Sequence, residues 1–282
     1  MKKILITGAR GMLGQDLCTT FQEDGVKLLP LTHDDLDITD QVMVRQILQM
    51  QKPDIIIHAA AYTKVDVAED EKDLCLSVNA QGTKNIAVEA QEIGAVLVYV
   101  STDYVFDGRR ETLYREDDEV SPLNVYGESK LAGETFTRAH LAKHFIVRVS
   151  WLYGHGGSNF VKSIMAKAKR GKSLNVVDDQ YGVPAFTADV AGALKRLLKT
   201  KAYGTYHMVS QGVCSWHAFA QEILRLNEWK NELNPIMTGQ AERKAKRPKY
   251  SAMSIEKLQA LLGQEVMPTW QEGLKRYLQL SK

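Results

Sequence analysis

Cysteine is scarce in this chain, whose 282 residues contain only Cys18, Cys75 and Cys214. The three are far apart, odd in number, and in none of the spacings that bind a metal or form a disulfide framework. We therefore expect reduced thiols and a cytoplasmic protein. The first residues fit this expectation, because they lead directly into a strand pattern and a glycine-rich turn rather than into the apolar region of a signal peptide.

The chain also lacks a long apolar run and an excess of one charge. No stretch approaches the roughly eighteen apolar residues that a membrane span needs, so we expect no membrane insertion. With 36 basic and 34 acidic residues the formal net charge is +2. No run of one sign is long enough to hold nucleic acid or an anionic membrane. The hydrophobic share of 44% is ordinary for a soluble protein with a full core.

What the first half does contain is a regular alternation of short apolar runs with helical patterns. The apolar runs span residues 3–7, 26–31, 54–59, 95–101 and 145–150. Helices fit the gaps after Gly11, after Thr39, and across residues 68–93 and 126–143. Strands separated by helix-length segments predict a parallel sheet covered on both faces, which is the doubly wound α/β or Rossmann architecture.

This rhythm changes after Trp151. The pattern there predicts a helix ending at Arg170, a strand over 174–177, a turn at 181–184, a helix over 188–198 capped by Thr187, and a strand over 204–209. Further helices are predicted over 215–226, 255–262 and 270–280, with a polar loop through 247–248. We predict a Rossmann domain made of residues 1–150 plus about 185–210, and a smaller, interleaved C-terminal α/β domain made of about 151–184 and 211–282.

The turn after the first predicted strand carries three glycines in the spacing GxxGxxG. Such a turn lets the backbone approach a diphosphate closely and points the amide groups of the next helix at it. Between a strand and a helix, the pattern favours a dinucleotide site over a simple packing turn. The candidate cofactor-binding residues in it are Gly8, Arg10, Gly11, Met12, Leu13 and Gly14.

The adenosine end of a dinucleotide would lie past the second strand. Acidic residues at this place bind the ribose hydroxyl groups of NAD, whereas a nearby cation favours the additional phosphate of NADP. Asp34 and Asp35 favour the first cofactor, and Arg10 and His33 favour the second. Because Arg10 lies in the glycine turn itself, we predict NADPH as the cofactor, with NADH possible.

The third strand and the helix after it contribute candidates with two readings. The small residues Ala59, Ala60 and Ala61 either lie against a flat ligand or simply pack closely. Asn79, in the middle of the predicted helix 68–93, either bridges neighbouring elements or orders a water molecule near the chemistry. Thr102, at the end of the fourth strand, lies at the edge where parallel sheets bind ligands, although a threonine there often only closes a turn.

Tyr126 and Lys130 stand four residues apart on a predicted helix, which places both side chains on one face. A phenol has an ordinary pKa near 10, so it is a poor acid at neutral pH unless a cation stabilises its anion. Lys130 would supply that cation. One such pair is expected by chance in a chain of this composition, so the pair gains meaning only from the glycine turn and from Thr102.

A glycine turn, a Ser/Thr at a strand end and a Tyr/Lys pair four apart resemble the extended short-chain dehydrogenase/reductases. Within that family, several segments resemble the dTDP-4-dehydrorhamnose reductases. These segments are 101–106 (STDYVF), 122–134 (PLNVYGESKLAGE), 150–153 (SWLY) and 179–184 (DQYGVP), together with Arg247, Pro248 and Ser251. The resemblance extends over nearly the whole chain.

This resemblance implies a Rossmann domain that binds NAD(P) and a second domain that binds a sugar nucleotide. It implies that Thr102 hydrogen-bonds the substrate carbonyl, Tyr126 donates the proton, and Lys130 binds the nicotinamide ribose and lowers the pKa of Tyr126. It further implies cofactor contacts for Asp37, Ile38, Ala61, Tyr62 and Thr63, and we add Ala59, Ala60 and Asn79 as cofactor candidates. Substrate contacts are implied for Asp103, Tyr104 and Trp151, with a core aromatic as the alternative role of Trp151. Arg247, in the basic stretch 243–249, either meets the substrate diphosphate or belongs to a solvated loop. The implied reaction reduces dTDP-4-dehydro-L-rhamnose to dTDP-L-rhamnose.

Metal binding and assembly are less defined. Some members of the family hold magnesium between acidic side chains at a dimer contact, but here Asp16 has no second acid in the segment 184–188. We therefore predict no metal, and leave monomer and homodimer both open. The rival readings are an epimerase or dehydratase of the same fold, and a non-catalytic regulatory subunit. Tyr104 stands where dehydratases carry a second acid, which disfavours that activity.

Overall fold

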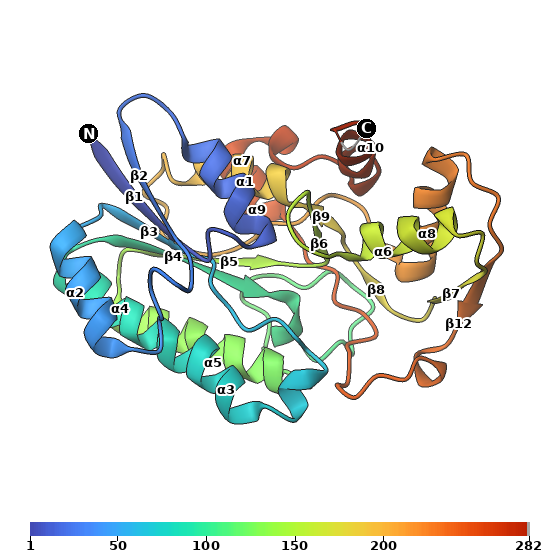
Figure 1. Ribbon diagram of the computed structural model, residues 1–282, viewed down its shortest axis with the longest axis horizontal. Helices are drawn as coiled ribbons and strands as arrows, with labels where there is room; N and C mark the ends of the chain where they lie inside the picture. The colour runs from blue at the N-terminus through green and yellow to red at the C-terminus, as the bar shows by residue number, and fades with distance from the viewer. Residues whose placement is uncertain (281–282) are drawn as a thin grey trace.

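Six parallel strands form the central sheet of the computed structural model, which describes residues 1–280 (Figure 1). The strand order is β10-β5-β4-β3-β1-β2, and all neighbouring pairs run parallel. The strands are β1 (Lys2–Thr7), β2 (Val26–Leu31), β3 (Ile55–His58), β4 (Val96–Thr102), β5 (His144–Val149) and β10 (Gly204–His207). The predicted doubly wound α/β architecture is confirmed.

Helices cover both faces of this sheet. Helix α1 (Met12–Phe21) packs against α7 (Thr187–Leu197) on one face, and α2 (Gln41–Gln51), α4 (Thr83–Glu92) and α5 (Val125–His140) cover the other. Successive side chains of β1 serve the two faces in turn. Ile4 and Ile6 join the core beneath α1 and α7, whereas Leu5 joins the core beneath α2 and α4. This period of two is what a strand buried on both sides requires.

A smaller lobe has an apolar core of its own, which includes Phe219 and Leu274. Its strands are β6 (Leu152–Tyr153), β7 (Leu174–Val177), β8 (Tyr181–Gly182), β9 (Ala185–Phe186), β11 (Cys214–Ser215) and β12 (Leu233–Ile236). Its helices are α6 (Phe160–Lys169), α8 (Trp216–Leu226) and α10 (Trp270–Leu280). Helix α9 (Glu256–Leu262) instead packs against β10 and joins the core of the large sheet. The C-terminal stretch therefore serves both cores.

The helix predicted over 68–93 is not one regular helix. It is divided into η1 (Val67–Glu69), α3 (Lys72–Leu76), the π-helical η2 (Ser77–Gly82) and α4. A π turn contains one extra residue, and such turns are frequent at functional sites. The remaining short helices are η3 (Asp103–Val105), η4 (Thr238–Gln240) and η5 (Gln264–Val266).

The predicted role of Thr187 as a helix cap is wrong. Thr187 is the first residue of α7, and its side chain makes no capping bond. Its hydroxyl instead contacts the carboxylate of Asp16 and the carbonyl of Tyr153, since these acceptors lie on neighbouring elements. Strand β12 was missed, because its sequence reads as a loop and its only partner is β7.

The structure also shows the state of the three cysteines and the character of the helices. Cys18, Cys75 and Cys214 are free, and Cys75 and Cys214 are buried. Within residues 1–280, no helix has both the length and the apolar character that crossing a bilayer demands.

Candidate active site

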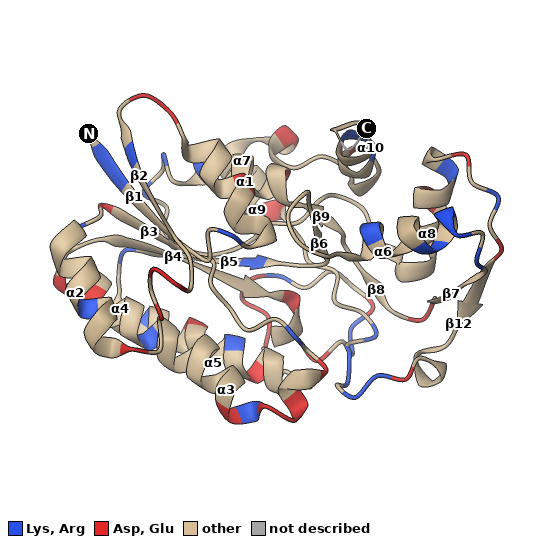
Figure 2. Cartoon of the chain, viewed as in Figure 1, with Lys and Arg blue, Asp and Glu red and all other residues tan. Residues whose placement is uncertain are grey.

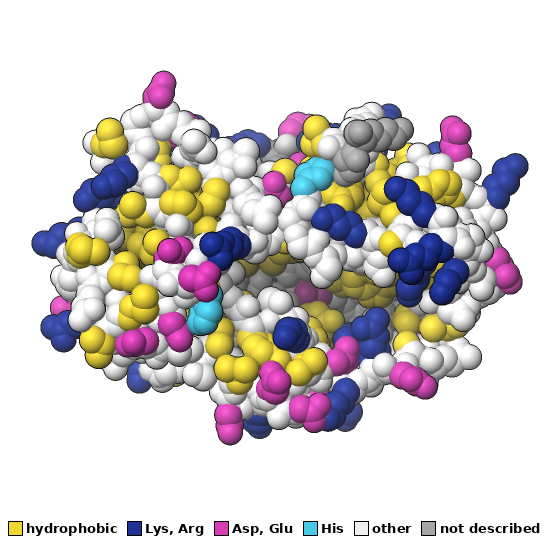
Figure 3. Space-filling model, in the orientation of Figure 1, with side chains coloured by type: hydrophobic (Ala, Val, Ile, Leu, Met, Phe, Trp, Pro, Cys, Tyr) yellow, Lys and Arg dark blue, Asp and Glu magenta, His cyan; other side chains and the backbone are white. Residues whose placement is uncertain are grey.

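A cavity of about 900 Å³ opens at the carboxyl ends of β1, β3, β4 and β5. Figure 3 shows this face of the molecule hollowed between the two lobes. Predicted site residues that line the cavity are Gly8, Arg10, Gly11, Met12, Leu13, Gly14, Asp37, Ile38, Ala59, Ala60, Ala61, Thr63, Thr102, Asp103, Tyr104, Tyr126, Lys130 and Trp151. Tyr62, Asn79 and Arg247 are not among its lining residues.

The glycine turn is shaped by backbone approaches that exclude side chains. Gly8 has a φ of +69°, and a Cβ there would lie 2.7 Å from the backbone nitrogen of Ala60. A Cβ on Gly14 would lie 2.1 Å from the carbonyl oxygen of Gly8. The turn therefore folds tightly onto β3 and onto the start of α1. The turn lines the cavity at the N-terminus of α1, which is where a helix binds a diphosphate.

Arg10 and Asp34 form an exposed ion pair at the rim of the cavity, with Nη1 2.7 Å from Oδ2. The other nearby acids are engaged locally. Asp35 accepts hydrogen bonds from Thr32, and Asp37 accepts two from Thr39, which lower the pKa of both carboxyl groups. Arg10 is thus a cation at this rim that could turn toward the additional phosphate of NADP. It would then give up its ion pair with Asp34, which is exposed to solvent and therefore weak.

Asn79 binds the backbone of the segment 59–63, most of whose residues line the cavity. Its Oδ1 accepts the N–H of Tyr62 at 2.8 Å and its Nδ2 donates to the carbonyl of Tyr62 at 3.0 Å. The same Nδ2 donates to Ser129 on α5. Asn79 is buried in the π-helical turn. Of the two sequence readings, the geometry favours the bridge, because Asn79 fixes the segment 59–63 against α5.

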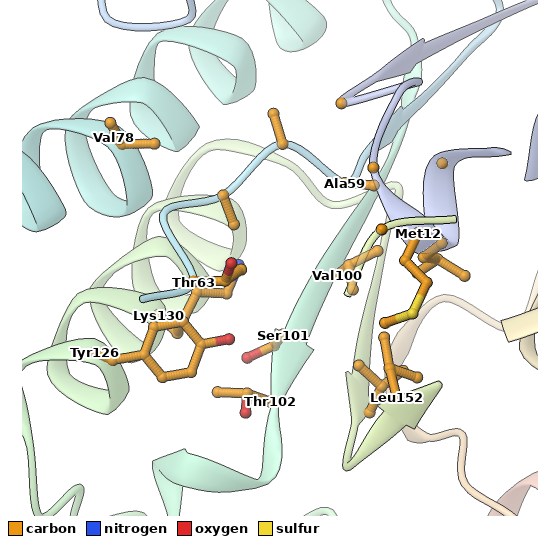
Figure 4. A pocket seen from close by; sticks show the side chains of 18 of the residues that line it. Met12, Ala59, Thr63, Val78, Val100, Ser101, Thr102, Tyr126, Lys130 and Leu152 are labelled. Atoms are coloured by element: carbon orange, nitrogen blue, oxygen red, sulfur yellow. The ribbon is translucent and has the colours of Figure 1, made fainter. Parts of the chain in front are cut away.

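Thr102, Tyr126 and Lys130 meet at the inner end of the cavity. Figure 4 shows Tyr126 and Lys130 on α5 facing Ser101 and Thr102 at the end of β4. Asn124 caps α5, since its Oδ1 accepts the N–H of Gly127 at 2.8 Å. This cap fixes the first turn of α5, and with it the direction of the Tyr126 side chain.

Burial controls the acidity of both residues of the Tyr/Lys pair. It raises the pKa of Tyr126 above its ordinary value, even though an interaction with Thr102 opposes the rise. It lowers the pKa of Lys130 to about 7, although the charge of Glu134 acts in the opposite direction. The expectation that Lys130 lowers the pKa of Tyr126 is thus not met in this state, because desolvation outweighs the cation.

Tyr99 supports Lys130 from beneath. The ammonium group lies 4.1 Å from the centroid of the Tyr99 ring, and the Tyr99 hydroxyl donates to the Lys130 carbonyl at 3.2 Å. A Cβ on Gly133 would lie 2.2 Å from this hydroxyl. Helix α5 can therefore approach β4 closely only because residue 133 is glycine.

Asp103 joins the two lobes beside Thr102. Its carboxylate accepts the Ser251 hydroxyl at 2.6 Å and the Thr102 hydroxyl at 3.1 Å. Burial raises the pKa of Asp103 to about 6, and the hydrogen bond from Ser251 limits the rise. Asp103 is therefore a buried carboxylate in direct contact with Thr102.

Two tryptophans form a flat wall of the cavity. The Trp151 and Trp216 rings stack with centroids 3.6 Å apart and planes 8° from parallel. Trp151 adopts φ +45°, which is uncommon outside glycine, and its ring lies against Gly182, where a Cβ would be 2.6 Å away. Sequence reasoning missed Trp216, since the first residue of a helix 65 positions away carries no local signal of this stacking.

A second cavity, of about 1230 Å³, has walls that combine charged and apolar side chains. Its cations are Arg109, Arg110, Lys246, Arg247 and Lys249, its acids are Asp107, Glu111, Asp178 and Asp179, and its apolar side chains include Leu123, Tyr181, Met237 and Tyr250. Arg247 lines the second cavity and its charge acts on the hydroxyl group of Tyr104, which lines the first. The two cavities are thus neighbours on either side of the Tyr104 and Arg247 side chains.

No group of three or more His, Cys, Asp or Glu side chains in residues 1–280 is arranged to hold a metal ion. Asp16 is the acid considered above for a magnesium contact between subunits, and Asp189 directly follows the segment 184–188, which contains no acid. Asp16 accepts the hydroxyl of Thr187, and Asp189 pairs with Arg276.

Comparisons with known proteins cover the whole chain. The family model described as RmlD substrate binding domain matches residues 1–282. The spore coat polysaccharide biosynthesis protein SpsK of Bacillus subtilis is 39% identical, covering 99% of this chain and 98% of SpsK. The dTDP-4-dehydrorhamnose reductase of Aggregatibacter actinomycetemcomitans is 38% identical, covering 98% of both chains. The crystal structure of the Bacillus anthracis dTDP-4-dehydrorhamnose reductase in complex with NADP is 44% identical, with a TM-score of 0.96, covering 99% of this chain and 100% of that one.

Proposed function

Because the chain belongs to the RmlD substrate binding domain family and is similar over its full length to dTDP-4-dehydrorhamnose reductases, we propose that it reduces dTDP-4-dehydro-L-rhamnose to dTDP-L-rhamnose with NADPH. One observation carries the proposal. Thr102, Tyr126 and Lys130 converge at the inner end of a cavity whose other end is the glycine turn. A hydride donor and a carbonyl acceptor therefore fit in one continuous space.

The residues of the cavity fit a dinucleotide. The turn from Gly8 to Gly14 admits no side chains at either of these glycines, so its backbone would hold the diphosphate. Ile38 and Asp37 would lie beside the adenine, and Arg10 would bind the 2′-phosphate. The reduced nicotinamide, when bound, supplies the hydride. Asn79 and Tyr62 would act by holding the backbone of the segment 59–63 in place.

Three side chains would handle the substrate carbonyl. Thr102 would donate a hydrogen bond to the carbonyl oxygen, and Tyr126 would give that oxygen its proton as negative charge develops on it. Donation leaves a phenolate on Tyr126. The ammonium group of Lys130 would stabilise this phenolate and bind the nicotinamide ribose. The elevated pKa of buried Tyr126 keeps the phenol protonated until the oxygen becomes basic enough to take the proton.

The sugar nucleotide would extend from the first cavity toward the second. Trp151 would face the sugar ring together with Asp103 and Tyr104. The cations of the second cavity would balance the charge of the diphosphate, and its apolar side chains would contact the base. Arg247, at the junction, would contribute to this end of the substrate.

Two further properties are also proposals. Free cysteines, two of them buried, support a reducing and therefore cytoplasmic location. Both a monomer and a homodimer are compatible with this site, because all the residues named above come from one chain.

The decisive experiment follows NADPH absorbance with dTDP-4-dehydro-L-rhamnose as substrate, and identifies the product. We expect one NADPH consumed for each dTDP-L-rhamnose formed. The variant Tyr126→Phe should lose about 10²- to 10⁴-fold in kcat because its proton donor is gone, while its affinity for NADPH changes little. Conversion of the substrate into an isomeric keto sugar nucleotide without net NADPH consumption would instead favour an epimerase. Undiminished turnover by Tyr126→Phe would refute the proton-donor role.

A further inference from the structure

Asp66 collects hydrogen bonds from a loop of the smaller lobe that lies 177 to 181 residues further along the chain. Its Oδ1 accepts the backbone N–H groups of Lys244 and Ala245, each at 3.1 Å. Arg247 binds both carboxylate oxygens, at 2.9 and 2.7 Å, and Arg243 lies at 3.5 Å. These contacts, of which the hydrogen bonds from Arg247 have the largest effect, hold the pKa of Asp66 well below its ordinary value.

We call residues 243–249 the basic loop, since it carries Arg243, Lys244, Lys246, Arg247 and Lys249. Figure 2 shows its blue segments beside the acidic residues that precede α3. Three of these cations, at positions 246, 247 and 249, line the second cavity. The conformation of the basic loop therefore determines where these three charges lie.

On the other side of the contact, Asp66 belongs to the segment that lines the first cavity. Thr63 and Val65, just before it, are lining residues there. Glu69, three residues after it, accepts the N–H of Val125, the first residue of α5, at 3.0 Å. Asp66 is thus attached both to the cofactor side of the cavity and to the helix that carries Tyr126.

The basic loop touches the same helix from its own side. The side chain of Asn124, which caps α5, donates to the carbonyl of Lys246 at 2.8 Å. The charge of Arg247 acts on the Tyr104 hydroxyl group, and the Tyr104 ring stands edge-on to Tyr126 with centroids 5.6 Å apart. A series of interactions therefore runs from Asp66 through Arg247 and Tyr104 to Tyr126.

The charge of Asp66 is what permits this arrangement. Arg247 is largely buried, with 11% of its side chain exposed. A guanidinium has five N–H donors, and here three of them go to Asp66 and to the carbonyl of Ala245. Without the carboxylate, a buried cation would lack its counter-charge, and it would stand among the other cations of the loop.

We propose that Asp66 is a positioning residue for the sugar nucleotide, because its carboxylate fixes the basic loop and the interaction of Arg247 with Tyr104 against the start of α5. The substrate site is complete only when this carboxylate joins the loop to the cofactor-lining segment. This inference rests on the proposed function, since the loop it positions belongs to the substrate site of that reductase.

The first test compares the steady-state kinetics of Asp66→Asn with those of the wild type. The amide keeps the size of the side chain but loses the charge and one acceptor. We expect the KM for dTDP-4-dehydro-L-rhamnose to rise about tenfold or more, with a smaller fall in kcat and little change in the KM for NADPH. Asp70→Asn is the matched control, because Asp70 is exposed and pairs with Lys244 alone.

The second test does not depend on the activity. The basic loop contains four sites for trypsin, after Arg243, Lys244, Lys246 and Lys249, because Pro248 blocks cleavage after Arg247. Its exposure is therefore measured by limited proteolysis of the folded, full-length proteins. Cleavage within residues 243–249 should be about fivefold faster or more in Asp66→Asn than in the wild type, and unchanged in Asp70→Asn. Should Asp66→Asn fail to fold, Arg247→Lys breaks the same two-point contact while it keeps the charge, and should also be cleaved faster.

The outcomes separate the two proposals. A wild type that does not reduce the keto sugar nucleotide refutes the proposed function, whereas the proteolysis result still reports on the Asp66 contact. A wild type that is active, with an unchanged substrate KM in Asp66→Asn, overturns the inference. So does equal cleavage of the wild type and Asp66→Asn, or a rise in KM of the same size in Asp70→Asn.

Discussion

Lys130 illustrates how one side chain can be buried and still keep a useful charge. Burial disfavours the ammonium form and lowers its pKa to about 7, while Glu134 and the thiol side chain of Cys75 act in the opposite direction. The neutral ring of Tyr99 lies 4.1 Å from the ammonium group. A cation over an aromatic face in a desolvated site gains about 2 kcal/mol, which favours the charged form that the proposed mechanism needs.

Substitutions of Tyr99 separate the ring from its hydroxyl group. Tyr99→Phe keeps the ring, so we expect kcat to depend on pH as in the wild type, declining as pH rises through the pKa of Lys130 near 7. Tyr99→Leu removes the ring, which lowers the pKa of Lys130 further. The decline should then move to lower pH by about one unit. The measurement is kcat from about pH 5.5 to about pH 9 for the wild type and both folded variants, a range that includes the midpoint near 7. Superimposable profiles of the wild type and Tyr99→Leu would exclude a role for the ring.

At the scale of elements, α5 orients the candidate site as a unit. Tyr126, Lys130 and Glu134 follow one another at intervals of four residues, so they share one face. The last of them, Glu134, binds Ser101 and Arg148 in the core, with contacts of 2.6 to 2.9 Å. Because Ser101 precedes Thr102 on β4, this buried network aligns the helix with the strand that carries the third candidate residue.

Two glycine substitutions test the fit of α5 against β4. In Gly133→Ala the new methyl group would lie 2.2 Å from the Tyr99 hydroxyl, so the helix must shift. We expect a loss of about 1–3 kcal/mol in the free energy of unfolding and a fall in turnover. Gly192→Ala, in α7, meets nothing within 4 Å and should gain about 0.5–1 kcal/mol with unchanged turnover. For both variants, urea unfolding measures the free energy of unfolding and NADPH oxidation measures turnover. Equal stability of the two variants would contradict the close approach of α5 to Tyr99 on β4.

At the scale of the whole molecule, the two lobes are connected by long-range polar contacts as well as by the chain. Asp103 of the sheet lobe accepts the hydroxyl of Ser251, 148 residues away. Asp66 binds the basic loop in the same way. Helix α9 also packs onto β10, so the C-terminal stretch completes the core of the large sheet. We propose on these grounds that the sheet lobe does not fold from residues 1–150 alone.

The raised pKa of Asp103 predicts how global stability depends on pH. The folded protein holds this proton up to about pH 6, whereas the unfolded chain releases it near 3.8. The contribution of Asp103 is therefore fully present below pH 3.8 and is lost as pH rises through 6. Asp103→Asn lacks this loss, so its free energy of unfolding relative to the wild type should rise by about 3 kcal/mol between these pH values.

Chemical denaturation at a series of pH values measures this difference. Asp73→Asn is the control, because Asp73 is exposed on α3 and should give a difference that does not vary with pH. A constant difference for Asp103→Asn as well would mean that Asp103 titrates in the folded state as it does in the unfolded chain.

Local sequence patterns were sufficient to predict the sheet, the glycine turn and the ends of the strands. These features follow from local periodicity and from residues such as Gly8 and Gly14, where a Cβ would collide with neighbouring backbone atoms. The position of Thr102 also followed, since parallel strands bring their carboxyl ends to one edge. The spacing of Tyr126 and Lys130 was sufficient to place both on one helical face, where they are found.

The contacts between residues far apart in the sequence could not be predicted and became visible only in the tertiary structure. Trp216 stacks on Trp151, and Asp66 holds Arg247, across separations of 65 and 181 residues that no local pattern encodes. The pKa values of Tyr126 and Lys130 likewise depend on the tertiary structure. The pair of Tyr126 and Lys130 suggested a lowered pKa for the phenol, but desolvation raises it, because the packing of α5 against β4 removes water from both groups.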